Sequence, residues 1–207
     1  SIKNILHSMK TYKALLSTAI FIFILLCAYY IDIRFFKVDV VFYSSLYVAI
    51  LSSILAAAIL YKVSFFSVFS GFEKKQMVLI WILLGYIFAI SIPTVIDRSL
   101  SFYILEKLQQ RGGGIRLDKF NYIFTTEYMR EHRLVDIRLT EQVASGTIVI
   151  EGNCVKLTDR GDALASFGQF FRRNLLPKKR LLRGEYTDQL IDPFSRSDSR
   201  PDYLCNQ

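Results

Sequence analysis

Three runs of about twenty residues without a single charged side chain dominate the first half of the sequence. They are residues 14–31, 40–61 and 77–96, and none contains Asp, Glu, Lys, Arg or His. A helix of about 20 apolar residues spans the hydrocarbon core of a bilayer. Because lipid offers no partners to backbone polar groups, each run is expected to be helical. The sequence therefore predicts a membrane α-helical domain, residues 1–96, with three transmembrane helices.

The charges are concentrated in the second half of the chain. Residues 1–96 hold only eight of the 26 Lys and Arg residues and three of the 18 Asp and Glu residues. The remainder has the charge density of a water-soluble domain. We therefore expect a soluble domain to follow residue 96 of a multi-pass integral membrane protein. We place that protein in the bacterial inner (cytoplasmic) membrane.

The spans and their connections carry further signals. The second run is rich in small residues, which let helices approach closely and favour self-association through that face. Residues 62–76 alternate aromatic residues and valine with serine. This pattern fits either an interfacial or re-entrant segment or an ordinary amphipathic loop. Pro93 is expected to disturb the end of the third span and free backbone carbonyls.

The orientation in the membrane is not decided by the positive-inside rule. Three spans place the two termini on opposite faces. The loops and flanks on each face carry six Lys and Arg residues near the spans. The dominance of the first helix favours a cytoplasmic N-terminus, whereas the fold type of the soluble domain favours a cytoplasmic C-terminus.

Residues 97–176 show the periodicities of a small α+β domain. Three helical segments are followed by a hairpin around Gly152-Asn153 and by a fourth helix from Asp159. Gly146 is expected to end the third helix in the left-handed conformation, and Thr158 or Asp159 to cap the fourth. The expected core of the hairpin and helices comprises Leu139, Val143, Ile148, Ile150, Val155, Leu157 and Leu164.

The segment from about 99 to 175 resembles a winged-helix domain. The resemblance is carried by Arg138, Leu139, Ser145, Gly146 and Ile148, and then by Leu157, Thr158 and Gly161. It implies a fold more firmly than a function. In winged-helix regulators the third helix and the wing contact DNA. Here acidic residues occur on that helix and at the wing tip, so we expect Arg133 and Arg138 to contact a protein partner and not nucleic acid.

The densest positive charge lies beyond this domain, in the segment 177–207 and the turn before it. The basic residues are interleaved with leucines, and they are Arg172, Arg173, Lys178, Lys179, Arg180 and Arg183. Such a segment suits an anionic lipid surface. The alternative is a solvated basic tail. The polar sequence that follows is expected to form a disordered tail.

No catalytic constellation, metal site or cofactor motif is recognisable. His7 and His132 have no ligands at metal-binding spacing, and the three cysteines are expected to be free thiols. Asp97 and Arg98 lie at the predicted membrane boundary, where they are candidates to hold a lipid phosphate headgroup. The alternative is an interfacial anchor beside a helix N-cap at Asp97 or Ser99.

These observations leave three functions open. The first is a non-catalytic subunit, whose spans anchor it while the winged-helix-like domain docks a protein, such as an envelope or lipid-linked glycan enzyme. The second is a membrane-tethered transcriptional regulator. The third is an enzyme or carrier that acts on a lipid phosphate near Asp97 and Arg98. Of these, the sequence favours the first.

Overall fold

The computed structural model describes residues 2–196 and 205. The chain divides into two compact units, Ser1–Glu131 and His132–Gln207, and each is described on its own. The segment 97–176 therefore has its first helices in one unit and its hairpin in the other.

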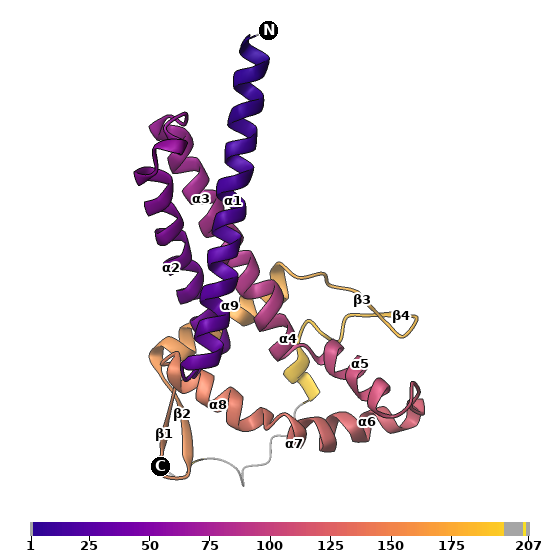
Figure 1. Ribbon diagram of the computed structural model, residues 1–207. Helices are drawn as coiled ribbons and strands as arrows, with labels where there is room; N and C mark the ends of the chain where they lie inside the picture. Colours follow the sequence, from indigo (N-terminus) through magenta and orange to yellow (C-terminus); the bar gives the residue numbers. More distant parts are fainter. Residues whose placement is uncertain (1, 197–204, 206–207) are drawn as a thin grey trace. The chain divides into compact units, whose positions relative to one another are not determined.

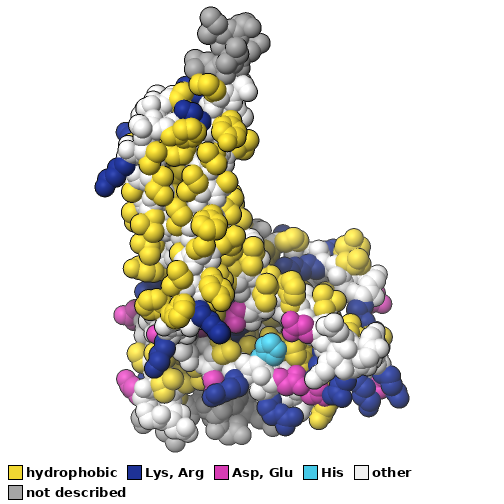
Figure 2. All heavy atoms as spheres, in the orientation of Figure 1, with side chains coloured by type: hydrophobic (Ala, Val, Ile, Leu, Met, Phe, Trp, Pro, Cys, Tyr) yellow, Lys and Arg dark blue, Asp and Glu magenta, His cyan; other side chains and the backbone are white. Residues whose placement is uncertain are grey.

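Three long helices that lie side by side form the larger part of the first unit (Figure 1). They are α1 (Ile2–Phe35), α2 (Val41–Lys62) and α3 (Gly71–Ala89). All three are long and apolar enough to cross a membrane, and the third such stretch continues to Arg98. Apolar side chains cover the visible face of this bundle (Figure 2). The prediction of three long apolar helices is confirmed.

The centre of the bundle is a stacked aromatic pair. Phe21 of α1 is 0% exposed and Trp81 of α3 is 1% exposed. Their ring centroids lie 5.6 Å apart with an interplanar angle of 6°. The indole Nε1 of Trp81 donates a hydrogen bond to Thr18 Oγ1 at 3.1 Å. In lipid, such contacts stabilise the bundle through dispersion and hydrogen bonding, because the surrounding acyl chains are as apolar as the core.

The second helix meets its neighbours through small side chains. Its buried residues are Ser45, Val48, Ala49, Ser52, Ser53, Ala56 and Leu60. The approach is so close that a Cβ atom built on Gly85 would lie 2.9 Å from the Cβ of Ala49. The buried hydroxyl of Ser53 donates to the Ala49 carbonyl at 2.8 Å. The small-residue face of this span is therefore packed within the chain itself.

The connection between α2 and α3 closes one end of the bundle. It contains the 3₁₀ turn η1 (Ser64–Phe66), and the rings of Phe66 and Phe69 are buried. The Nζ atom of Lys10 on α1 lies 2.8 Å from the carboxylate of Glu73 at the start of α3. The connection thus contains a 3₁₀ turn, and residues 71–76 already belong to α3, so both interpretations of residues 62–76 stay open.

Regular α-helical hydrogen bonding ends where Pro93 enters the third span. The π-helix η2 (Ile90–Thr94) contains this proline, and α4 (Val95–Arg98) follows it. Proline has no backbone N–H, so one carbonyl of the preceding turn loses its donor. The Thr94 hydroxyl donates to the Ala89 carbonyl at 2.7 Å. A side chain thus satisfies a carbonyl where the helix changes its hydrogen-bond pattern.

The first unit ends in two shorter helical stretches. Tyr103 and Ile123 are buried between them. The first stretch is α5 (Leu100–Gln110), and the second is made of η3 (Leu117–Lys119), α6 (Phe120–Tyr122), the π-helix η4 (Ile123–Tyr128) and α7 (Met129–Glu131).

In the part that the structure describes, the second unit contains two hairpins and two α-helices. Its elements are α8 (Leu134–Ala144), β1 (Ile148–Glu151), β2 (Cys154–Leu157), α9 (Asp159–Asn174), β3 (Arg180–Leu182), β4 (Glu185–Thr187) and η5 (Pro193–Arg196). Strands β1 and β2 are antiparallel, with Ile148 opposite Leu157. The helices and hairpin expected after the spans are therefore present.

Two local predictions in this unit are confirmed. Gly146 follows α8 with a φ of +69°, the left-handed conformation that favours glycine. Thr158 caps α9, because its side chain accepts a hydrogen bond from the Gly161 backbone N–H at 3.1 Å.

The segment 177–207 was expected to be a basic stretch followed by a disordered tail. Among the residues that the structure describes there, strands β3 and β4 form a hairpin with Arg180 opposite Thr187. The remainder of the predicted tail, residues 197–204 and 206–207, lies outside the described residues.

Candidate functional site

The predicted lipid-phosphate pair lies on α4, directly after the third span. Asp97 is exposed and Arg98 is half-buried. Ser99 is the N-cap of α5, and its hydroxyl accepts a hydrogen bond from the Phe102 backbone N–H at 3.3 Å. The local geometry therefore includes the helix cap that was the alternative interpretation of this sequence.

A pocket that the sequence did not reveal lies at the turn between α1 and α2. Its volume is about 250 Å³, and it is lined by Tyr29, Asp32, Ile33, Phe36, Val38, Val41, Ser44 and Ser45. The Ser44 hydroxyl donates a hydrogen bond to the Asp32 carboxylate. We name this cavity the boundary pocket, because it lies where one apolar helix ends and the next begins. The signal available in the sequence was a carboxylate one turn before the end of a span.

The position of Tyr29 links the boundary pocket to the end of the third span. Its ring packs edge-on against Phe88 of α3, with centroids 5.3 Å apart. Both Asp32 and Asp97 lie near enough to act electrostatically on its hydroxyl. The structure thus brings the predicted Asp97 into the neighbourhood of a polar group on α1.

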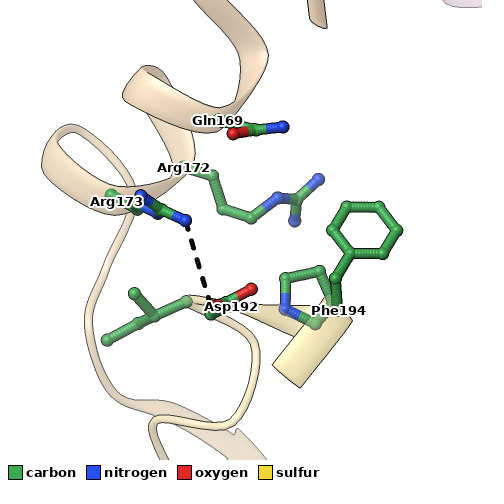
Figure 3. A pocket seen from close by; sticks show the side chains of 7 residues that line it. Gln169, Arg172, Arg173, Asp192 and Phe194 are labelled. Carbon is green, nitrogen blue, oxygen red and sulfur yellow. Dashed lines mark ion pairs between the residues drawn. The ribbon is translucent and has the colours of Figure 1, made fainter. Parts of the chain in front are cut away.

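A second pocket, of about 280 Å³, uses two of the predicted basic residues. It lies in the second unit between the last turns of α9 and the residues around η5, and Gln169, Arg172, Arg173, Ile191, Asp192, Pro193 and Phe194 line it. Figure 3 shows Arg172 extending toward Phe194, while Arg173 turns toward Asp192. The latter pair is 3.9 Å apart, which is a loose ion pair. The pocket therefore combines positive charge with apolar walls.

The other predicted basic residues are spread along a turn and a hairpin. Lys178 and Lys179 are exposed after α9, Arg180 begins β3, and Arg183 adopts a φ of +51° in the turn before β4. They do not continue α9, which ends at Asn174. The basic segment is thus an exposed, irregular surface.

The two arginines predicted to bind a partner are already paired on α8. Arg133 Nε lies 2.8 Å from Asp136, and Arg138 lies 2.7 Å from Glu141. On the first hairpin, Lys156 of β2 lies 2.6 Å from Glu151, the last residue of β1. These pairings leave little unbalanced positive charge on α8 and the hairpin.

A network of charges between α5 and the following helical stretch was missed by the sequence analysis. The Lys107 side chain is 4% exposed, and its Nζ lies 2.6 Å from carboxylates of both Glu127 and Glu131. The Tyr103 hydroxyl donates to Glu131 at 2.8 Å. Tyr103 and Glu131 are 28 positions apart in the sequence, so their spacing alone does not predict that they pair.

The ionisation of this network follows from its geometry. Hydrogen bonds to Glu127 and Glu131 raise the pKa of Lys107 above its ordinary value. The same ammonium group holds the pKa of Glu127 below its usual range. Burial, together with the hydrogen bond to Glu131, raises the pKa of the Tyr103 hydroxyl to about 12. At neutral pH Lys107 is protonated and pairs with the two carboxylates. We therefore interpret the network as a contact that stabilises the fold.

The cysteines differ from the prediction of three free thiols. Cys154 of β2 and Cys205 form a disulfide, with Cα atoms 5.9 Å apart, and Cys27 is free. The Cα separation is within the range of protein disulfides. The prediction was wrong for this pair because the two residues are 51 positions apart, and only the path of the chain brings them together.

The predicted core of the hairpin and α9 is also wrong in its larger part. Leu139 and Ile148 are half-buried, but Val143, Ile150, Val155, Leu157 and Leu164 are exposed, with Ile150 at 50% and Leu164 at 60%. The elements meet instead through the backbone at Gly161, where a Cβ would lie 2.0 Å from the Thr147 carbonyl oxygen. The Leu157 side chain also lies against this position, where its Cδ1 would be 2.8 Å from such a Cβ, although much of that side chain is exposed.

The exposed apolar side chains form what we name the apolar face of the second unit. On α9 it comprises Leu164, Phe167, Phe170, Phe171 and Leu175, and on one side of the hairpin it comprises Ile150, Val155 and Leu157. Exposed apolar groups of this number mark surfaces that contact a protein or a membrane.

No cluster of three or more His, Cys, Asp or Glu residues that suits a metal ion occurs in the described part of the chain.

Comparison of the chain with models of known protein families, with curated proteins and with solved structures found no match.

Proposed function

We propose that this chain is a multi-pass membrane protein that acts as a non-catalytic anchoring and docking subunit. Helices α1 to α3 hold it in the bilayer, and the C-terminal unit binds a protein partner at the membrane surface. The observation that carries the proposal is the apolar face, whose aromatic residue Phe167 is 59% exposed. Aromatic side chains are enriched in the centres of protein interfaces, where they supply much of the binding energy.

Charge supports a membrane surface beside that partner. Arg172 and Arg173 follow the apolar residues of α9, and Lys178, Lys179 and Arg180 come after them. Each basic residue close to an anionic bilayer contributes about 1 kcal/mol of binding. We propose that this end of the unit rests on anionic lipid while the apolar face contacts the partner.

The disulfide supports a location outside the cytoplasm. Disulfides persist in oxidising compartments and are rare in the bacterial cytosol. The Cys154–Cys205 bridge therefore favours an orientation with a cytoplasmic N-terminus and an exported C-terminal unit. This orientation agrees with the usual dominance of the first helix in setting topology.

The experiment that tests docking is photo-crosslinking in intact cells. A photoreactive phenylalanine analogue at Phe167 should give one discrete protein adduct, and the added substitution Phe171→Asp should abolish it. The same analogue at Asp162, an exposed polar position of α9, is the matched control. Equal adduct patterns at the two positions, or adducts with lipid alone at Phe167, would contradict the docking function.

A membrane-tethered regulator is the second candidate, and the order of helices, hairpin and helix favours it. The ion pairs of Arg133 and Arg138 on α8 count against it. The full chain in nanodiscs should bind duplex DNA weakly at physiological salt. A slope of binding against salt that implies six or more phosphate contacts would favour the regulator instead.

A further inference from the structure

The boundary pocket carries an inference that rests on the membrane-spanning role of α1 to α3 but not on the docking function. We propose that it binds the primary ammonium headgroup of a phospholipid of the phosphatidylethanolamine type. The occupant is argued from the position of the pocket, the groups that line it and the charges around it.

The position places the pocket at the level of lipid headgroups. Helix α1 ends at Phe35 and α2 begins at Val41, so the short connection between them marks a membrane boundary. Asp32, the carboxylate in the pocket, lies one turn before the end of α1. An ionisable residue so close to the apolar part of a span is costly unless it has a partner, and such residues commonly mark functional sites.

The polar lining matches a primary ammonium group. An ammonium group carries three N–H donors and no acceptor. Asp32, Ser44 and Tyr29 line the same cavity, and each carries an oxygen that can accept a hydrogen bond. Among them Asp32 supplies the negative charge, and Ser44 fixes its orientation through a hydrogen bond. A charge-assisted hydrogen bond to a carboxylate is stronger than one between neutral groups.

The apolar lining and the surrounding charges match the rest of such a lipid. Ile33 and Phe36 are exposed beside the pocket, and Val38 and Val41 complete its wall. They offer a surface for the first part of an acyl chain. The connection also carries Arg34 and Lys37, both exposed, which suit the lipid phosphate.

The size of the pocket and the number of carboxylates restrict the alternatives. At about 250 Å³ the cavity is at the small end for a ligand site and suits a headgroup, not a whole lipid. A metal ion is less suitable, because the described residues contain no cluster of three or more acidic, His or Cys ligands. A quaternary ammonium headgroup has the charge but no N–H donors, so it provides the sharpest comparison.

The test is lipid binding by the purified full chain, measured by native mass spectrometry with lipids of identical acyl chains. We expect phosphatidylethanolamine to bind about 10-fold or more tightly than phosphatidylcholine, because only the former donates hydrogen bonds to Asp32. Asp32→Asn should reduce this preference to below about 3-fold, mainly through weaker binding of phosphatidylethanolamine, since the amide keeps the shape but loses the charge that strengthens hydrogen bonds from the primary ammonium group. Ser44→Ala should reduce it by a smaller factor.

The matched control is Asp39→Asn, because Asp39 lies in the same connection but is exposed and does not line the pocket. It should keep the full preference. Fluorescence of Trp81 verifies that each variant retains the packed bundle. A wild-type preference below about 3-fold, or an equal loss in the Asp39 variant, would each overturn the proposal. Loss of partner crosslinking at Phe167 leaves this assay unchanged, so the two proposals fail separately.

Discussion

The contact between Phe21 and Trp81 yields a quantitative prediction about how the bundle is held together. Phe21 is 0% exposed, whereas Phe23, two residues later on the same helix, is 69% exposed. The two residues are chemically identical, so replacing each by alanine separates internal packing from contact with lipid.

The expected magnitude follows from the volume that is emptied. In a bilayer the transfer of an apolar side chain out of water no longer contributes, which leaves the cavity term. Removing a phenyl ring vacates roughly 100 Å³, and at about 24 cal/mol per Å³ this corresponds to about 2.4 kcal/mol. We therefore expect Phe21→Ala to lower the free energy of unfolding by about 2 kcal/mol and Phe23→Ala by less than about 0.5 kcal/mol.

The assay is reversible unfolding by SDS of the protein in mild detergent micelles. Trp81 is the sole tryptophan of the chain and stacks on Phe21, so its fluorescence reports the contact directly. Equal losses of stability in the two variants would refute the reasoning, because they would mean that the buried pair contributes no more than a lipid-facing ring.

Three further predictions concern other contacts. Gly85→Ala should destabilise the bundle by about 1–3 kcal/mol through its clash with Ala49, and the added change Ala49→Gly should restore most of the loss in the same SDS assay. Thr158→Ala should cost the second unit about 1 kcal/mol, measured by hydrogen exchange of the Gly161 amide, and an unchanged exchange rate would remove the cap from the account. Stability of the first unit should fall between pH 10 and about pH 12, because the Tyr103 hydroxyl ionises near 10 in the unfolded chain but holds its proton to about 12 when folded; thermal unfolding against pH tests this, and Tyr103→Phe should reduce the dependence, leaving the part due to the raised pKa of Lys107.

The predictions from sequence succeeded where one local rule determines the outcome. Uncharged runs of this length have few structural alternatives, so the three long helices were predictable. Gly146 and Thr158 were predictable for the same reason, because a left-handed C-cap and an N-cap each depend on a few neighbouring residues. Pro93 marked the change of hydrogen-bond pattern in the third span.

The predictions failed or were absent where the outcome depends on distant residues. Lys107 reads as one more surface charge until the fold places Glu127 and Glu131 around it. Alternation along the hairpin predicted an apolar inner face, but Ile150 and Leu157 are half or more exposed, although Leu157 also touches α9 at Gly161. Periodicity shows which residues share a face, but it does not show what covers that face.

The boundary pocket illustrates the same limit. Asp32 directly follows the first apolar run and Ser44 lies near the start of the second, and no local sequence rule pairs them. The turn between α1 and α2 brings them together, which is how a polar cavity arises at the edge of two otherwise apolar helices.

The central claim is that three spans place the C-terminal unit on the face opposite to the N-terminus, in an oxidising compartment. It is tested most directly by labelling single cysteines in intact cells with a membrane-impermeant maleimide, with Cys27 replaced by alanine and the Cys154–Cys205 disulfide retained. Cysteines at Asp39 and Gln189 should be labelled without permeabilisation, and a cysteine at Ser8 only after it. Labelling of positions 8 and 189 from the same side would contradict the account.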